Sequence, residues 1–219
     1  MRTLRLVASG LALVALYPAT GWSQSQTGEG RGFKDSWFWG AKAGLLSFST
    51  VASGSAWAPL VGADWLITRS RGALYVSLDQ SFFDERSALV DQQGNVFEIG
   101  MRDMRRFTVA ALAFPIRYGG IRPYAGLGLS MNFIQSASSI TPVDDPATAS
   151  ALREAIDDQK DRASIVFMGG AQWQYRRFSL FGQATYMPSR DRFLLNDRSS
   201  YLLEGGIRVN LGTSIERPK

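Results

Sequence analysis

The sequence contains no cysteine and no histidine among its 219 residues. Without histidine the chain has no imidazole base, no Ser-His-Asp triad and no histidine-ligated zinc. Without cysteine it forms no disulfide and offers no thiolate nucleophile or iron–sulfur ligand. The 24 Lys and Arg residues outnumber the 19 Asp and Glu residues, but they are spread along the chain rather than gathered into a nucleic-acid-binding stripe. The composition therefore argues against an enzyme, a cofactor and a nucleic-acid partner.

A charged stretch, an apolar stretch and a small-residue stretch follow one another at the N-terminus. Arg2 and Arg5 precede an apolar run over residues 6–17, and small residues follow it. This order is typical of a secretory signal peptide, and the run is shorter than the roughly twenty residues that cross a bilayer as a helix. We expect a cleaved signal peptide over residues 1–23 and a flexible periplasmic leader over residues 24–35.

The rest of the chain alternates apolar with small or polar residues at period two, the pattern of half-buried β-strands. The pattern is clearest over residues 122–134, where the odd positions are all apolar and the even positions as far as 132 are small, polar or Tyr. No later stretch approaches the roughly eighteen consecutive apolar residues of a membrane-spanning helix. Eight alternating segments cover about 37–45, 59–68, 74–79, 110–117, 122–134, 164–174, 178–186 and 203–212.

The connections between these segments alternate between long and short. They cover about 50–56, 69–72, 84–103, 119–120, 135–162, 176–177 and 188–199. In an antiparallel barrel this alternation gathers the long loops at one end and the short turns at the other, as in transmembrane barrels. Gly119-Gly120 suits a two-residue hairpin, whereas the turn at Arg176-Arg177 is inferred from the flanking alternation alone.

Each segment has an aliphatic face and an opposite face that carries the charges. In the fourth segment this assignment places Ala110, Leu112, Phe114 and Ile116 on the aliphatic face. Six charged residues share the opposite face: Lys42, Asp64, Asp79, Arg117, Glu204 and Arg208. A soluble barrel would turn these charges to water, whereas a membrane barrel turns its aliphatic face to lipid and pairs the charges inside.

Aromatic residues on the aliphatic face favour the membrane barrel. They form two bands, Trp39, Tyr118, Tyr175 and Phe178 at the short-turn end, and Phe82, Phe133 and Tyr186 at the long-loop end. Two bands with aliphatic residues between them match interfacial girdles, whereas a sandwich would scatter its aromatics along the core. Strands of about ten residues, tilted by roughly 40°, climb about 25 Å, the height of an outer-membrane apolar band.

Two short motifs resemble those of a known group of proteins. Residues 122–130, RPYAGLGLS, resemble the Pro-Tyr-x-Gly-x-Gly strand of the small eight-stranded outer-membrane barrels typified by the OmpA transmembrane domain. Residues 204–211, EGGIRVNL, resemble the insertion signal of their terminal strand, with Glu204, Gly206, Val209 and Leu211 at its positions. The resemblance spans about residues 36–212 and implies an all-β, eight-stranded antiparallel up-and-down transmembrane barrel.

The same resemblance implies contacts with outer-membrane lipid and lipopolysaccharide, and insertion by the barrel-assembly machinery as a monomer. The chain departs from the group's pattern at its end, because such chains commonly finish on an aromatic residue. Here residues 213–219 follow the signal and are expected to form a periplasmic tail.

The interior of an eight-stranded barrel is filled by side chains, which argues against a wide channel. Lys42 and Asp64 lie symmetrically about Ser53, so a simple hairpin predicts that they pair. The other four inward charges would extend this pair into a network. A structural plug is favoured over a gated conduit or a proton path.

Two long outer loops carry local structure of their own. In loop 84–103 the turn sequence QQGN lies between apolar runs and predicts a hairpin that extends strands three and four above the membrane. Asp145 and Pro146 predict the N-cap and first residue of a short helix, about fourteen residues long, in loop 135–162. Leu152 and Ile156 form an apolar stripe on this helix, which either closes the barrel mouth, the favoured assignment, or contacts a partner.

We therefore expect an outer-membrane barrel with a structural or surface-interaction role. One alternative is sideways passage of small apolar molecules between strands, supported by a kink at Pro115. A second is adhesin-like binding through loops 84–103 and 135–162. In the last loop Arg190, Arg192 and Arg198 are candidate contacts for lipopolysaccharide phosphates.

Overall fold

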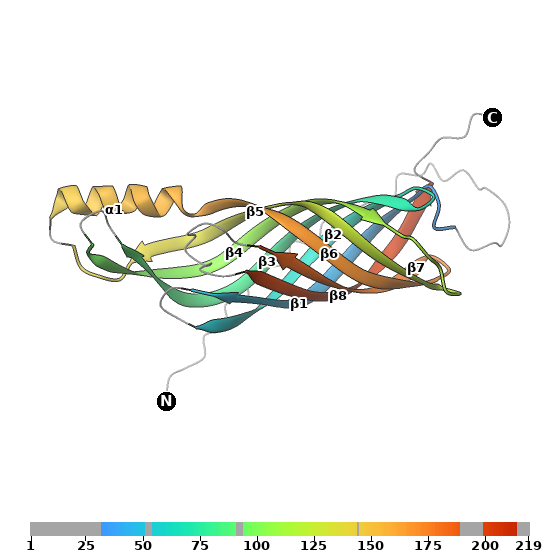
Figure 1. Cartoon of the computed structure of the whole chain (residues 1–219), viewed down its shortest axis with the longest axis horizontal. Coiled ribbons are helices and arrows are strands. Elements are labelled where there is room, and N and C mark those ends of the chain that lie inside the picture. The colour runs from blue at the N-terminus through green and yellow to red at the C-terminus, as the bar shows by residue number, and fades with distance from the viewer. Residues whose placement is uncertain (1–31, 51–53, 91–93, 144, 189–198, 214–219) are drawn as a thin grey trace, which may run out of the picture.

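Eight antiparallel strands close into a barrel in which each strand pairs with the next along the chain and β1 pairs with β8 (Figure 1). The computed structural model describes residues 32–50, 54–90, 94–143, 145–188 and 199–213. Its elements are β1 (Ser36–Ser49), β2 (Ser55–Thr68), β3 (Gly72–Val90), β4 (Val96–Ala113), β5 (Ile121–Ser139), α1 (Pro146–Asp158), β6 (Asp161–Tyr175), β7 (Phe178–Met187) and β8 (Ser200–Thr213). The predicted up-and-down barrel with a short helix in the third long loop is confirmed. The predicted signal peptide lies outside the described residues.

Strand alternation decides which side chains enter the barrel. Exposed and buried residues alternate without exception along β7. Large aliphatic side chains on the outer surface, such as Leu127, Leu129 and Ile165, are more than half exposed. Charged and polar side chains such as Lys42 and Arg208 are buried inside. The barrel is therefore apolar on its outside and polar in the middle of its interior, the reverse of a soluble barrel.

The strands differ greatly in length. β7 has 10 residues and climbs about 25 Å at a tilt of roughly 40°, whereas β3 and β5 have 19 residues each and climb about 48 Å. The hairpin predicted in loop 84–103 is confirmed, because β3 and β4 stay paired as far as Val90 and Val96. Figure 1 shows these strands running beyond the rest of the barrel at one end, with α1 beside them. We call residues 84–90, 96–102 and 135–139, together with α1, the outer projection.

Strand four departs from the prediction in both length and phase. β4 ends at Ala113, and the Phe114 amide donates to the Arg71 carbonyl 2.8 Å away. Pro115 has no N–H to continue the ladder and lies beyond the strand. Ala110, Leu112 and Phe114 are buried inside, so the face assigned to lipid was wrong. The barrel interior is apolar at this level, and hydrophobicity alone therefore does not identify the lipid face.

The two shortest turns agree with the sequence. Tyr118 and Ile121 exchange backbone hydrogen bonds of 2.9 Å around Gly119-Gly120, and Gly119 adopts a φ of 58°. β6 ends at Tyr175 and β7 begins at Phe178, so the inferred two-residue turn is also present. There Arg176 takes a φ of 53°, a left-handed conformation that a residue with a Cβ rarely adopts.

Candidate functional site

A buried ion cluster occupies the middle of the barrel interior. The Lys42 ammonium lies 2.8 Å from Asp79 Oδ1 and 2.7 Å from Glu204 Oε1, and all three side chains are nearly inaccessible to solvent. Lys42 Nζ also donates to the Tyr75 hydroxyl at 2.8 Å. Gln183 donates to Tyr75 Oη at 3.1 Å and to Glu204 Oε2 at 2.7 Å. One buried cation therefore has two carboxylates and a phenol as partners, and Gln183 links the phenol to one of these carboxylates.

A second buried pair lies nearer the short-turn end. Arg208 Nε donates to Asp64 Oδ1 at 2.8 Å, and its Nη2 approaches Asp64 Oδ2 at 3.2 Å. Its third nitrogen donates to Gln172 at 3.2 Å, and the guanidinium lies 3.6 Å from the centre of the Phe181 ring. The forked contact and the ring face satisfy a charge that is completely buried, as such a charge requires.

Tyr75 lies between the two groups of ions. Its ring centre is 5.5 Å from Lys42 Nζ and 5.7 Å from Arg208 Cζ. Tyr124 continues the connection by donating to Gln183 Oε1 at 3.0 Å. The interior charges thus belong to one continuous polar layer rather than to separate pairs.

Arg106 is a sixth interior charge that sequence reasoning missed. It is buried opposite Asp79 in the β3–β4 register, and its Nε donates to Asn132 Oδ1 at 2.7 Å. Its Nη1 has no hydrogen-bond partner among the described residues. With Arg106, three cations and three carboxylates occupy the polar layer, so the formal charges of these six side chains sum to zero.

Arg117 does not belong to this layer, contrary to the prediction. It follows the end of β4, is exposed, and donates to the Gly119 carbonyl at 2.6 Å. The error follows from the inverted phase of strand four. The structure brings the other five predicted charges, Lys42, Asp64, Asp79, Glu204 and Arg208, into the barrel interior.

The predicted Lys42–Asp64 pair is also wrong. In the β1–β2 register Lys42 lies opposite Gly62, and Asp64 lies opposite Gly40. The hairpin is therefore centred one residue before Ser53, which moves the two side chains to different levels of the barrel. Asp64 instead pairs with Arg208, which lies opposite Gly40 on β8. The two side chains meet over Gly40, which has no side chain of its own.

Apolar side chains close the polar layer on both sides. Toward the long-loop end these buried residues are Leu46, Leu60, Met104, Ile134 and Leu202, and toward the short-turn end they are Phe33, Phe38, Leu66, Leu112 and Phe114. Water and ions entering from either end would have to pass such a layer. The arrangement separates the buried charges from both aqueous compartments.

Phe33 shows that the end of the expected leader is part of the barrel. Its ring packs edge-on against Phe114 at 4.7 Å, and the Arg122 guanidinium lies 4.3 Å from its centre. The Thr68 hydroxyl donates to its carbonyl, and the same Thr68 oxygen accepts the Ser36 amide at 3.0 Å. A flexible leader extending to residue 35 is therefore wrong for residues 32–35, because Phe33 is buried in the short-turn mouth. Its apolar ring reaches the core before the strand begins.

The predicted aromatic bands lie on the outer surface. Trp39, Tyr118, Tyr175, Phe178, Phe82 and Tyr186 are exposed, and Phe133 is partly exposed. At the long-loop end Tyr186 packs against Tyr201 with ring centres 5.2 Å apart. At the short-turn end the Trp173 and Tyr175 rings stack at 6.1 Å.

The residues of the expected insertion signal divide between the two faces of β8. Glu204 is buried inside, and Gly206 faces inward where a Cβ would overlap the Ala41 carbonyl oxygen. Leu211 is exposed on the outside, and Val209 is partly exposed there. Their role in insertion stays a prediction.

The outer projection is held by its own contacts. Across the β3–β4 hairpin Arg102 pairs with Asp84 at 2.7 Å and Arg86 with Glu98 at 2.9 Å, all on an exposed face. The Arg102 guanidinium, by hydrogen bonding, lowers the pKa of the Asp84 carboxyl. The opposite face carries Ile99 and Met101, which are fully buried. The hairpin therefore has a polar outer face and an apolar inner one.

α1 begins as the sequence predicts. Asp145 is the N-cap and accepts the Thr148 amide at 2.8 Å, with Pro146 in the first turn. The hydrogen bonds from Thr148 lower the pKa of Asp145. No helix in the described part of the chain is long and apolar enough to cross a membrane.

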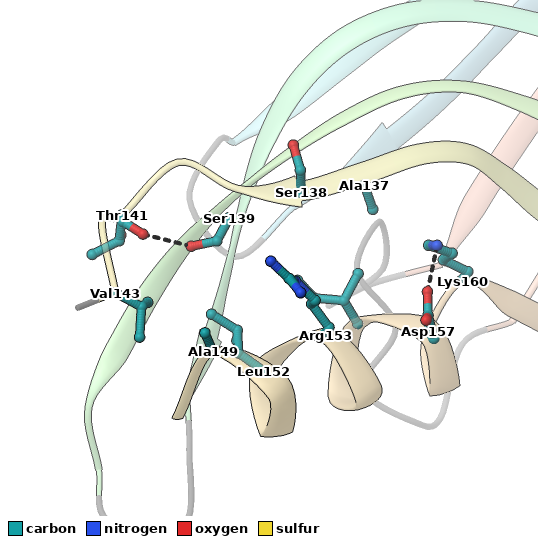
Figure 2. Close-up of a pocket in the computed structure, with 11 residues that line it drawn as sticks. Ala137, Ser138, Ser139, Thr141, Val143, Ala149, Leu152, Arg153, Asp157 and Lys160 are labelled. Atoms are coloured by element: carbon teal, nitrogen blue, oxygen red, sulfur yellow. Dashed lines mark hydrogen bonds and ion pairs between the residues drawn. The ribbon is translucent and has the colours of Figure 1, made fainter. Parts of the chain in front are cut away.

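α1 does not close the barrel mouth. It runs along the barrel's long axis beside the end of β5, and Leu152 and Ile156 are buried (Figure 1). The favoured assignment of this stripe is therefore wrong, because it packs within the outer projection instead of across the opening. A cavity of about 500 Å³ remains between α1 and β5. Figure 2 shows the residues that line it. The last-loop residues Arg190, Arg192 and Arg198 lie outside the described residues.

Among the described residues, no three His, Cys, Asp or Glu side chains are grouped as they would be to hold a metal ion. No protein-family model and no curated protein matches the chain. The crystal structure of Neisserial surface protein A (NspA) aligns with a TM-score of 0.52 and 14% identity, over 80% of this chain and 97% of that one. The chain has the fold of the small outer-membrane barrels. Ail, the attachment invasion locus protein of Yersinia pestis, aligns with a TM-score of 0.45 and 12% identity, over 80% of this chain and 99% of Ail.

Proposed function

We propose that the protein is an outer-membrane anchor whose sealed barrel holds the outer projection outside the cell as an interaction surface. The observation that carries this proposal is the unequal length of the strands. β3, β4 and β5 exceed the apolar band by roughly 20 Å, and α1 is added to the same side. A barrel that only stabilised the membrane would not need this extension.

The outer surface supports a membrane location. Among the described residues, thirty large hydrophobic side chains are exposed, far more apolar surface than a soluble monomer presents. They include residues of both aromatic bands and aliphatic residues between them, such as Leu127 and Leu129. Export through the predicted signal peptide and insertion as a monomer by the barrel-assembly machinery belong to the same proposal, as does contact with lipopolysaccharide.

The interior supports an anchor rather than a pore. The formal charges of the six interior side chains sum to zero, five of them are joined in ion pairs, and apolar layers separate all six from both ends. The alternative of sideways transport loses its supporting feature, because Pro115 lies beyond β4 and cannot bend it. Adhesin-like binding is the finer form of the proposal, with the outer projection as the binding part. Catalysis is not proposed.

Planar bilayers test the sealed barrel. Wild-type protein and Lys42→Met should both remain at background conductance, because the apolar layers persist when the ammonium is lost. Heat-modifiable gel mobility checks that the Lys42→Met barrel is still folded. A large rise in the conductance of this folded variant would contradict the hypothesis that the interior is a plug.

Intact cells test the interaction surface. Added protease should cut within the outer projection while the strands below it stay protected, and the protein should fractionate with the outer membrane. In a trimmed variant, short turns replace residues 84–102 and 140–160. This variant should insert normally, but cells that carry it should no longer bind to arrays of immobilised proteins and glycans. Recovery of wild-type protein in the soluble periplasm, or unchanged binding by the trimmed variant, contradicts the proposal.

A further inference from the structure

The far end of β5 is a free sheet edge among the described residues. β5 pairs with β4 as far as Ser139 and Ile99, but its pairing with β6 stops at Phe133 and Asp161. Beyond the Ile134 amide, which donates to the Lys160 carbonyl at 3.1 Å, β5 has one neighbouring strand only. Backbone N–H and C=O groups on such an edge are a template for another strand.

α1 stands beside this edge without covering it. Leu152 and Ile156 hold the helix in place, and the cavity of about 500 Å³ lies between the helix and residues 137–143 (Figure 2). Residues of the β5 edge form one wall of this cavity, and α1 forms the other. The volume is within the range of ordinary ligand pockets and takes a few side chains.

The lining of the cleft indicates which peptide would fit. Arg153 is exposed and points from α1 toward Ser139 in Figure 2. No hydrogen bond or ion pair is made by Arg153 within the part of the chain that the structure describes. Lys160 pairs with Asp157, so the three charges of the lining sum to one positive charge. The rest of the wall consists of apolar side chains, among them Val143 and Leu152, and of Ser138, Ser139 and Thr141.

We propose that the cleft between α1 and the edge of β5 binds an extended, acidic peptide segment of a partner protein, which adds to β5 as a further strand. Backbone hydrogen bonds to residues 135–139 would supply the register. An acidic side chain would pair with Arg153, and an apolar side chain would enter the pocket beside Leu152. The inference rests on the proposed function, because the cleft is part of the outer projection.

Selection from a peptide pool tests the cleft without a known partner. Full-length protein in lipid nanodiscs is used to select from random displayed hexapeptides, and the enriched sequences are synthesised and measured by fluorescence anisotropy. We expect sequences that alternate apolar with acidic residues. Arg153→Glu should weaken their binding by about tenfold or more, because it reverses the charge at the contact. Arg71→Glu makes the same change in the short turn at the other end and should leave binding unchanged.

A second measurement separates strand addition from charge attraction alone. Peptides N-methylated at alternate amides are made in both phases and keep their charge. The phase whose methyl groups face β5 cannot form the ladder and should lose binding, whereas the other phase should still bind. The unmethylated peptides should shift the amide resonances of residues 135–139. The proposal is overturned if no sequence family is enriched, if Arg153→Glu binds the peptides as well as wild type, or if both N-methylated phases or a sulfated disaccharide compete equally. If the trimmed cells lose binding while these peptide tests fail, only the cleft is wrong. If trimming changes nothing, the proposed function itself falls.

Discussion

Arg208 and Asp64 lie 144 positions apart in the chain and meet at 2.8 Å in the barrel interior. Arg208 is on β8 and Asp64 is on β2, and β1 lies between these two strands with Gly40 opposite both residues. A Cβ on Gly40 would come within 2.8 Å of the Asp64 carboxylate. The missing side chain therefore provides the space in which the two charges meet.

Replacing Asp64 by Asn should be among the most destabilising single changes in the protein. It leaves the Arg208 guanidinium buried without a counter-charge, which costs about 3–5 kcal/mol. Urea titrations of the barrel in lipid vesicles measure the free energy of unfolding. Adding Arg208→Met to Asp64→Asn should recover part of the loss, because no unpaired charge then remains.

The exposed pair in the outer projection is the matched control. Asp84 and Arg102 are separated by 2.7 Å and are both two-thirds exposed, so Asp84→Asn should change the unfolding free energy by less than about 1 kcal/mol. Similar losses for Asp64→Asn and Asp84→Asn would show that burial of the interior pair does not matter.

Two adjacent glycines of β8 should differ in how far replacement by alanine destabilises the barrel. A Cβ at Gly206 would overlap the Ala41 carbonyl oxygen, a backbone atom that cannot move aside, whereas one at Gly205 would lie 3.6 Å from the Phe181 carbonyl oxygen. Gly206→Ala should lower the unfolding free energy by about 1–3 kcal/mol, and Gly205→Ala should be nearly neutral. Vesicle unfolding titrations of the two variants compare them directly, and equal stabilities would refute the close approach of β1 and β8.

Much of the barrel could be predicted from alternation. In seven of the eight segments the outward face is predicted correctly, because aliphatic residues such as Leu127 and Ile207 alternate with small or polar residues. The helix was predicted from Asp145 and Pro146, whose capping chemistry is local. Such features depend on neighbouring residues only and are readable without the fold.

Features that depend on register could not be read in the same way. The hairpin is centred one residue away from the predicted centre, so Asp64 pairs with Arg208 and not with Lys42. The spacing of residues along the chain does not reveal such a shift. Arg106 was missed because it lies before the residues used to recognise strand four. It shares the parity of Thr108 and Leu112, so the correct phase would have placed it inside, opposite Asp79.

Phe33 should contribute to stability although it precedes the first strand. Its ring is buried against Phe114 and Arg122, so Phe33→Ala should lower the unfolding free energy by about 3–5 kcal/mol. Lys34→Ala, at an exposed neighbour, should have little effect. Thermal melts followed by gel mobility distinguish the two variants. If Phe33→Ala and Lys34→Ala melt at the same temperature, Phe33 is not a part of the core.

The N-terminus of α1 should weaken in acid. The Thr148 hydroxyl and amide donate to Asp145 and hold its pKa below the ordinary value of 3.8. Because the folded pKa is the lower one, the stabilisation by this cap is complete above pH 3.8 and is lost as the pH falls through the folded value. Amide hydrogen exchange at residues 147–149 should accelerate over that range in the wild type. Asp145→Asn keeps an acceptor oxygen that does not titrate, so its exchange should lack this acid transition, while Asp145→Ala should exchange fast at every pH. An acid transition of the same size in Asp145→Asn would assign the effect to another group.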